Sequence, residues 1–259
     1  MSETENQRAR IKGVFSSERI AKVGAGATVR KTTQTMYWFA EEDEQGVITI
    51  QPLNPNYVPS GPKQEIPKDE FLEQYAPEPE FYSSKVYPNI RKLNQTIAKA
   101  ERHRVNGDTY SAEYEFGNAL RVDEENIRAN FGLGLTYLER GETGKADNIF
   151  QRLIKMEATF EAEHKHLFND FGINLRKNEM YDQAVEYYAK ALELSPADEN
   201  LHYNMARACF AKADIEKTVE HLRTALSLNN KLEIAVKFLE YLKKNKLLPH
   251  NLSGAEPKV

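Results

Sequence analysis

Residues 167–196, LFNDFGINLRKNEMYDQAVEYYAKALELSP, decide the fold of this chain. Small and apolar residues recur there at the spacing of one helix face, twice in succession. The two faces hold Phe168, Phe171, Gly172 and Leu175, and then Ala184, Tyr188, Ala191 and Leu192. Asn178 and Glu179 indicate a tight turn between the helices, and Pro196 ends the second helix. Two such short amphipathic helices bury their apolar faces only against similar neighbours, so the stretch predicts one unit of a repeat.

Small residues at Gly172, Ala184 and Ala191 stand where two antiparallel helices must approach most closely, and large residues fill the spaces between them. This arrangement resembles the tetratricopeptide repeat, a helical hairpin with a period of about 34 residues. If the unit starts at Lys165, the signature positions hold Phe168, Phe171, Gly172, Leu175, Ala184, Tyr188, Ala191 and Pro196.

The same register recurs in both directions along the chain. A unit from Glu199 places Met205, Ala206, Cys209, Leu222 and Ala225 on signature positions. A unit from Ile127 does so with Leu133, Gly134, Tyr137, Ala146 and Phe150, if residues 161–164 are an insertion, and a unit from Leu93 with Ala100, Ala112, Phe116 and Ala119. We therefore predict a mainly α fold, a TPR α-solenoid with repeats at 93–126, 127–160, 165–198 and 199–232 and a capping helix at 233–246.

The residues before the repeats predict a small β module over 8–53, preceded by disorder over 1–7. Apolar and β-branched residues from Thr33 to Ala40, a polar turn over 41–46 and a second apolar run from Val47 to Leu53 indicate a β-hairpin. Because an isolated hairpin is marginal in water, a third strand is expected near 11–15 or 20–30. Apolar residues on both faces of the first strand predict that the earlier segment and a helix cover it.

Proline spacing predicts a connector over 54–92. Five prolines, Pro52, Pro55, Pro59, Pro62 and Pro67, exclude a continuous helix or a central strand and favour an extended path over the surface. A short helix from about Lys68 to Tyr75 should follow, and a second helix from about Glu80 should run into the first repeat. Residues 247–259 are expected to form a flexible tail.

The composition of the chain limits the classes of function that it can have. The chain has 259 residues, a net charge of −4, and no apolar run near the roughly 18 residues that span a membrane. A polar start predicts no cleavable secretory signal, and the single Cys209 is expected in the core, so we expect a cytoplasmic protein. His164 and His166 point to different sides of a helix, and no catalytic constellation stands out. We therefore expect no enzyme activity, no cofactor and no metal.

The resemblance to tetratricopeptide repeats implies a concave groove lined by the first helices of successive repeats, suited to a peptide or helix of another protein. Its aromatic, arginine and asparagine lining predicts a partner segment with apolar and acidic residues. The alternative is that Phe131, Leu135 and Ile173 only pack between repeats or under the N-terminal module. The predicted groove residues are Arg128, Phe131, Leu135, Asn169, Ile173, Arg176, Lys177, Asn200, Tyr203, Asn204, Arg207, Phe210, Lys237 and Phe238.

Two other functions stay open at this point. Basic residues of the N-terminal module, with Tyr37 and Trp38 beside them, could bind nucleic acid or a nucleotide, although aromatics that alternate within a strand favour a core instead. The candidate phosphate contacts are Arg19, Lys22, Arg30 and Lys31. The other function is a self-assembling scaffold, in which the groove of one molecule takes the N-terminal arm of another. The sequence disfavours nucleic acid and leaves a homo-oligomer open.

Overall fold

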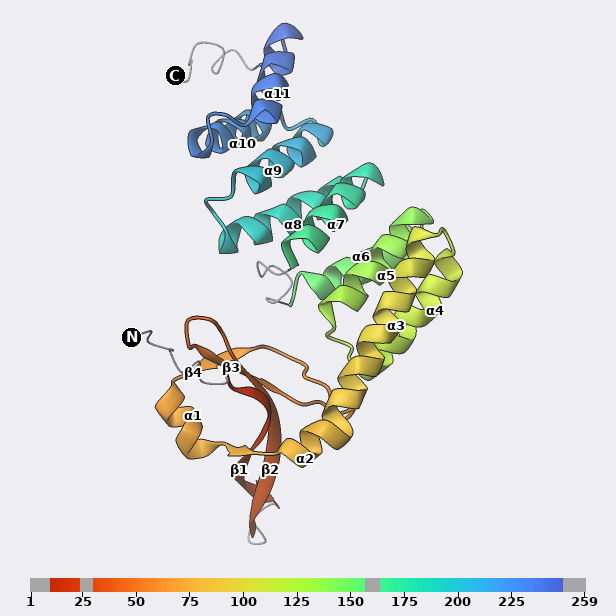
Figure 1. Ribbon diagram of the computed structural model, residues 1–259. Helices are drawn as coiled ribbons and strands as arrows, with labels where there is room; N and C mark the ends of the chain where they lie inside the picture. The colour runs from red at the N-terminus through yellow and green to blue at the C-terminus, as the bar shows by residue number, and fades with distance from the viewer. Residues whose placement is uncertain (1–9, 24–29, 157–163, 249–259) are drawn as a thin grey trace, which may run out of the picture. The chain divides into compact units, whose positions relative to one another are not determined.

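The structure, a computed structural model, describes residues 10–23, 30–156 and 164–248 (Figure 1). It divides the chain into two compact units, Met1–Ala129 and Asn130–Val259. Among the described residues, the first unit carries a small antiparallel sheet followed by helices, and the second consists of helices. The chain is therefore mainly α with a small N-terminal β module, as predicted.

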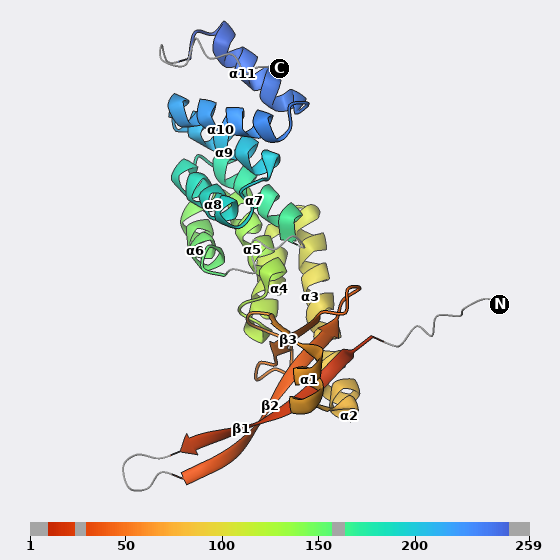
Figure 2. The same cartoon turned by 90° about the vertical axis from the view of Figure 1, so that its left-hand side faces the viewer.

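The sheet of the first unit has five strands in the order β4-β3-β2-β1-β5, all antiparallel. The predicted hairpin is formed by β2 and β3. The additional strand that was expected before this hairpin is β1, which pairs with β2 over its whole length. Figure 2 shows β1 and β2 extending beyond the other strands of the sheet. The strands are β1 (Lys12–Val23), β2 (Arg30–Glu42), β3 (Ile48–Pro52), β4 (Gln64–Ile66) and β5 (Ala76–Pro77).

Aromatic side chains cover both faces of β2, but not as the sequence predicted. On one face, Phe71 of α1 (Lys68–Gln74) is buried, and its ring lies 4.7 Å from that of Phe15. On the other face, the Tyr37 ring lies 4.5 Å from that of Phe81. The earlier segment does not cover a face, since β1 is hydrogen-bonded to the edge of β2. Helical residues that follow β3 in the sequence therefore cover both faces of β2.

The connector is more ordered than an extended surface segment. It contains the edge strand β4, and Val58 is fully buried. The amides of Asn54 and Asn56 both donate to the carbonyl oxygen of Val122, at 2.8 and 2.9 Å. Because a carbonyl at the end of a helix has no intrahelical partner, these bonds tie the connector to the last turn of the second helix of the first predicted repeat.

The helices that follow α1 make up most of the remaining described chain. In the first unit they are α2 (Pro79–Phe81), a π-helical turn (Tyr82–Val86), α3 (Tyr87–Val105) and α4 (Thr109–Val122). The remaining helices are α5 (Ile127–Glu139), α6 (Thr143–Leu153), α7 (Lys165–Lys177), α8 (Tyr181–Leu194), α9 (Glu199–Ala211), α10 (Ile215–Leu228) and α11 (Glu233–Lys244). The expectations for residues 1–7 and for the tail from 249 lie outside the described residues, as does most of the insertion at 161–164.

Glycines stand where helices of the second unit meet, as the sequence predicted. A Cβ atom on Gly172 would lie 2.6 Å from both Cζ and the hydroxyl oxygen of Tyr188. A Cβ atom on Gly134 would lie 2.6 Å from Cε2 of Phe171. Since real Cβ atoms essentially never come so close to a neighbour, only glycine fits at these two positions.

The first helix of each hairpin, and likewise α11, is followed by a residue with positive φ. These residues are Gly107, Gly141, Glu179, Ala213 and Lys246, at intervals of 34, 38, 34 and 33 residues. The residues seven positions before these turns are Ala100, Gly134, Gly172, Ala206 and Leu239, and at Gly134 and Gly172 the neighbouring side chains leave no room for a Cβ atom. The helix α11 therefore ends in the turn of a first repeat helix, but carries a leucine where the others carry glycine or alanine.

The turn at Ala213 predicts a stabilising substitution. Its φ of 61° is costly for a side chain with a Cβ atom, and two equivalent turns have glycine. We expect Ala213→Gly to raise the free energy of unfolding by about 0.5–1 kcal/mol, measured by urea denaturation. As a control, Ala189→Gly within α8 should lower it by about 1 kcal/mol. Equal effects of the two changes would contradict this account of the turn.

The described helices give no sign of a membrane span, because none of them is both long and apolar enough to cross a bilayer. Cys209 is buried on α9, which agrees with its expected place in the core, and burial is the main cause that raises the pKa of its thiol.

Candidate functional site

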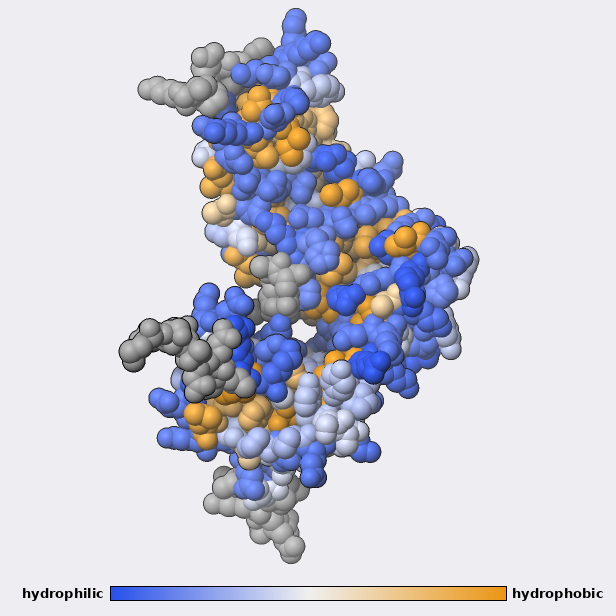
Figure 3. Space-filling model, in the orientation of Figure 1, coloured by the Kyte–Doolittle hydropathy of each residue, from blue (hydrophilic) through white to orange (hydrophobic). Residues whose placement is uncertain are grey.

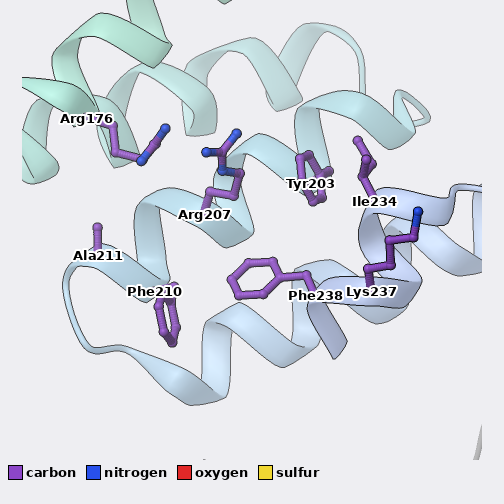
Figure 4. Close-up of a pocket in the computed structure, with 8 residues that line it drawn as sticks. All are labelled: Arg176, Tyr203, Arg207, Phe210, Ala211, Ile234, Lys237 and Phe238. Atoms are coloured by element: carbon purple, nitrogen blue, oxygen red, sulfur yellow. The ribbon is translucent and has the colours of Figure 1, made fainter. Parts of the chain in front are cut away.

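A pocket of about 470 Å³ lies on the first helices of successive repeats in the second unit (Figure 4). Arg176 on α7 stands at one end, residues of α9 form the middle, and residues of α11 close the other end. This is the face that was predicted to form the groove. The lining residues are Arg176, Tyr203, Arg207, Phe210, Ala211, Ile234, Lys237 and Phe238.

Aromatic rings form one wall of the pocket. The Phe238 ring lies 5.3 Å from that of Phe210 and 6.4 Å from that of Tyr203, both in edge-to-face contact. All three side chains are partly buried in the core cluster of the C-terminal helices. Figure 3 shows hydrophobic side chains gathered over this end of the second unit. The wall therefore offers a fixed apolar surface that still reaches solvent.

Two arginines lie across the pocket from Phe210 and Phe238, on the side where Tyr203 stands (Figure 4). The guanidinium carbon of Arg207 lies 5.7 Å from the centre of the Tyr203 ring, which holds it by a cation–π contact. Arg176 is half-buried, and this burial, followed by the positive charge of Arg207, lowers the pKa of its guanidinium. The two positive charges therefore lie close enough to repel each other.

None of the eight lining residues is acidic, so the pocket as a whole is positive and apolar. The third cation, Lys237, is exposed, and its Nζ lies 3.1 Å from Oε2 of Glu233 in the previous turn of α11. An exposed ion pair of this kind contributes little binding or stability of its own. Such a surface is suited to an anionic group that lies next to an apolar one.

Six of the fourteen predicted groove residues thus line one pocket. Two more are joined beside it, since the amide of Asn204 on α9 donates to Oδ1 of Asn169 on α7 at 3.3 Å. Three others lie on α7 and α9 outside the lining, with Ile173 half-buried and Lys177 and Asn200 exposed. Their part in binding stays a prediction.

Two of the predicted groove residues, Phe131 and Leu135, are buried instead of lining the pocket, and a third, Arg128, lies outside the lining, so that its part in binding stays a prediction. Phe131 is fully buried, with its ring 5.7 Å from that of Phe171, and Leu135 is also buried. Both pack between helices, as the alternative interpretation held for them. Arg128 belongs to the first unit, where its guanidinium lies 2.9 Å from Oε1 of Glu101. The position of a residue within the repeat could not show whether it lines the pocket, because the first repeat helices contribute residues both to the packing between helices and to the pocket.

Sequence reasoning missed two lining residues, Ala211 and Ile234. Ala211 is too small to be noticed among candidates for binding. Ile234 has about half of its surface exposed, which is uncommon for so apolar a residue at the start of a helix. Only its exposure on the structure separates it from the core residues of α11.

The N-terminal phosphate contacts receive less support. Tyr37 and Trp38 are half-buried, in ring contact with Phe81 and Tyr75, so they belong to the core of the module. Arg19 is exposed on β1. The other three, Lys22, Arg30 and Lys31, have their places in the strands, but their side chains lie outside the described part of the chain.

Two segments match models of the tetratricopeptide repeat, residues 127–160 and residues 175–237. The chain is 24% identical over 166 residues to anaphase-promoting complex subunit 3 of Schizosaccharomyces pombe, covering 60% of this chain and 24% of that protein. It is 26% identical over 158 residues to the peroxisomal targeting signal receptor of Candida albicans, covering 58% and 26%. The chain therefore spans about a quarter of the length of these two relatives.

Two solved structures are among those similar to this chain. MamA from Desulfovibrio magneticus RS-1 has a TM-score of 0.46 and 18% identity, covering 60% of this chain and 85% of that one. The pilF protein of Pseudomonas aeruginosa has a TM-score of 0.44 and 18% identity, covering 60% and 69%. With the repeat models matching two segments of the helical part, the chain carries tetratricopeptide repeats, which confirms the resemblance drawn from its sequence.

Proposed function

We propose that this protein is a non-enzymatic adaptor that binds a peptide or helix of a partner protein in the pocket on α7, α9 and α11. The observation that carries the proposal is the convergence of Arg176 and Arg207 with the aromatic wall of Phe210 and Phe238 in one hollow. Arginine and aromatic side chains are the types that dominate binding energy at protein interfaces. The cytoplasmic location expected from the sequence is part of this proposal.

The chemistry of the pocket specifies the partner segment. Its acidic residues would face the two arginines, and its apolar side chains would lie against the rings of Phe210 and Phe238. Two of the similar proteins are by name a receptor for a targeting signal and a subunit of a complex, and in both roles one protein contacts another. Protein binding is the role that these names have in common.

The double variant Arg176→Ala/Arg207→Ala tests the proposal. We expect it to weaken binding of the partner at least about tenfold, because each lost charge-assisted hydrogen bond contributes roughly 1.5–3 kcal/mol. The wild-type protein and the variant are immobilised, bound proteins are identified from the native lysate, and the affinity of each purified candidate is measured by titration calorimetry.

The control Lys243→Ala/Lys244→Ala removes two positive charges from the exposed end of α11, away from the pocket lining. It should bind the partner as the wild type does. Equal circular dichroism of all three proteins shows that the variants are folded. A partner that binds the arginine variant with unchanged affinity would rule out the pocket as its binding site.

A further inference from the structure

The two arginines of the pocket lack an acidic partner. In the part of the chain that the structure describes, Arg176 and Arg207 form no ion pair with a carboxylate. The pKa of Arg176 is lowered by its burial and then by the charge of Arg207, and the other groups that act on it are tyrosines rather than carboxylates. Several other cations of the second unit, such as Lys165, Lys212 and Lys237, do have a carboxylate within reach. The pair is therefore an uncompensated double positive charge.

Both guanidinium groups are directed to the same place. Figure 4 shows the ends of Arg176 and Arg207 on the same side of the pocket, with the rings of Phe210 and Phe238 on the other side. The charges of both arginines also act on the hydroxyl of the buried Tyr188. Two forks of N–H donors thus converge beside an apolar wall.

We propose that the pocket recognises a phosphorylated side chain of the partner segment, with the phosphoryl oxygens held between Arg176 and Arg207 and a neighbouring apolar side chain against Phe210 and Phe238. This inference rests on the proposed function, and it adds that binding depends on the phosphorylation state of the partner.

Charge decides between a phosphoryl group and a carboxylate. A phosphorylated side chain carries about −1.5 to −2 charges near pH 7 and three acceptor oxygens, so a single group can satisfy both guanidinium forks. One carboxylate carries a single charge and leaves the repulsion between Arg176 and Arg207 partly uncompensated. Two carboxylates placed between the same two arginines would repel each other in turn.

The choice of arginine supports the same conclusion. Guanidinium groups bind phosphate through two parallel hydrogen bonds, whereas a lysine acts as a point charge. The cation–π contact between Arg207 and Tyr203 holds one fork in place before a ligand binds. A site that is already ordered loses less entropy on binding, which favours discrimination between similar anions.

The test uses four peptide libraries with acetylated and amidated ends, so that no terminal charge competes. Their fixed centre is phosphoserine, serine, glutamate or a pair of glutamates, and the flanking positions are random. Each library is passed over immobilised full-length protein, over Arg176→Gln/Arg207→Gln, and over the control Lys243→Gln/Lys244→Gln. Because charge alone could bind phosphate, Arg176→Lys/Arg207→Lys is included as a folded variant that keeps both charges.

We expect the wild-type protein and the control to retain phosphoserine peptides at least about tenfold better than serine peptides, with apolar residues enriched beside the phosphoserine. The glutamine variant should lose this preference, and the lysine variant should keep only part of it. If paired glutamates were retained as well as phosphoserine, or if the glutamine variant kept the preference, the phosphoryl assignment would be wrong while peptide binding stood. If no library were retained, the phosphoryl assignment would be wrong, whereas the proposed function would fail only if the arginine variant also lost no partner from the native lysate.

Discussion

Replacing Phe171 by alanine is expected to lower the free energy of unfolding by about 3–5 kcal/mol, the usual cost of removing a buried aromatic ring. Phe171 is fully buried on α7, and its ring contacts those of Phe131 on α5 and Tyr187 on α8 at 5.7 Å each. It therefore joins two consecutive repeats as well as the two helices of its own repeat. In a repeat array, stability is the sum of such nearest-neighbour terms, so this loss should exceed that of most substitutions.

Urea denaturation of the full chain, followed by circular dichroism at 222 nm, measures the effect. The matched control is Leu194→Ala at the end of α8, where half of the side chain is exposed. We expect this change to stay within about 0.5 kcal/mol of the wild type. If Phe171→Ala cost no more than Leu194→Ala, the contact between these repeats would not hold the second unit together.

Replacing Gly172 by alanine is expected to lower the free energy of unfolding by about 1–3 kcal/mol, although alanine is the better helix former. The gain in helix propensity is at most about 1 kcal/mol. The new Cβ atom would lie 2.6 Å from the Tyr188 ring, and Tyr188 is 1% exposed, so the ring has no free space into which it can move. Overpacking therefore outweighs propensity.

The control for this prediction is Gly117→Ala in the middle of α4, where an added Cβ atom meets nothing within 4 Å. Here propensity acts alone, and we expect a gain of about 0.5–1 kcal/mol. The two glycine substitutions should thus change stability in opposite directions, which thermal unfolding would show as shifts of opposite sign in Tm. Shifts of the same sign would refute the close-contact explanation for Gly172.

The helical repeats could be predicted because their signal is local and periodic. Residues such as Gly172, Ala184 and Tyr188 return at a fixed spacing, and each has the burial that its place in the unit implies. The hairpin of β2 and β3 could be predicted for the same reason, since alternation of residue types is also local. Six of the eight lining residues of the pocket followed from the resemblance of the repeat units alone.

The remaining features depend on contacts between segments far apart in the sequence. The strands β4 and β5 are only three and two residues long. Their side chains show no strand pattern, and they are strands only because their backbones pair with β3 and β1. Asn54 and Asn56 resemble turn residues until the end of α4 is known to lie beside them. Phe131 and Phe210 are both aromatic residues of a first repeat helix, and only the neighbouring side chains decide that one is buried and the other accessible.

Leu239 limits how this protein could be lengthened by engineering. The helix α11 ends in the same turn as the other first helices, at Lys246, so a designer could attach a second helix there with standard geometry. Leu239 then stands at the position where Gly134 and Gly172 leave no room for a Cβ atom in the earlier repeats. Leu239 is already buried in the core with Val219 and Leu222, so a grafted repeat has to be designed around this side chain or needs a smaller residue there.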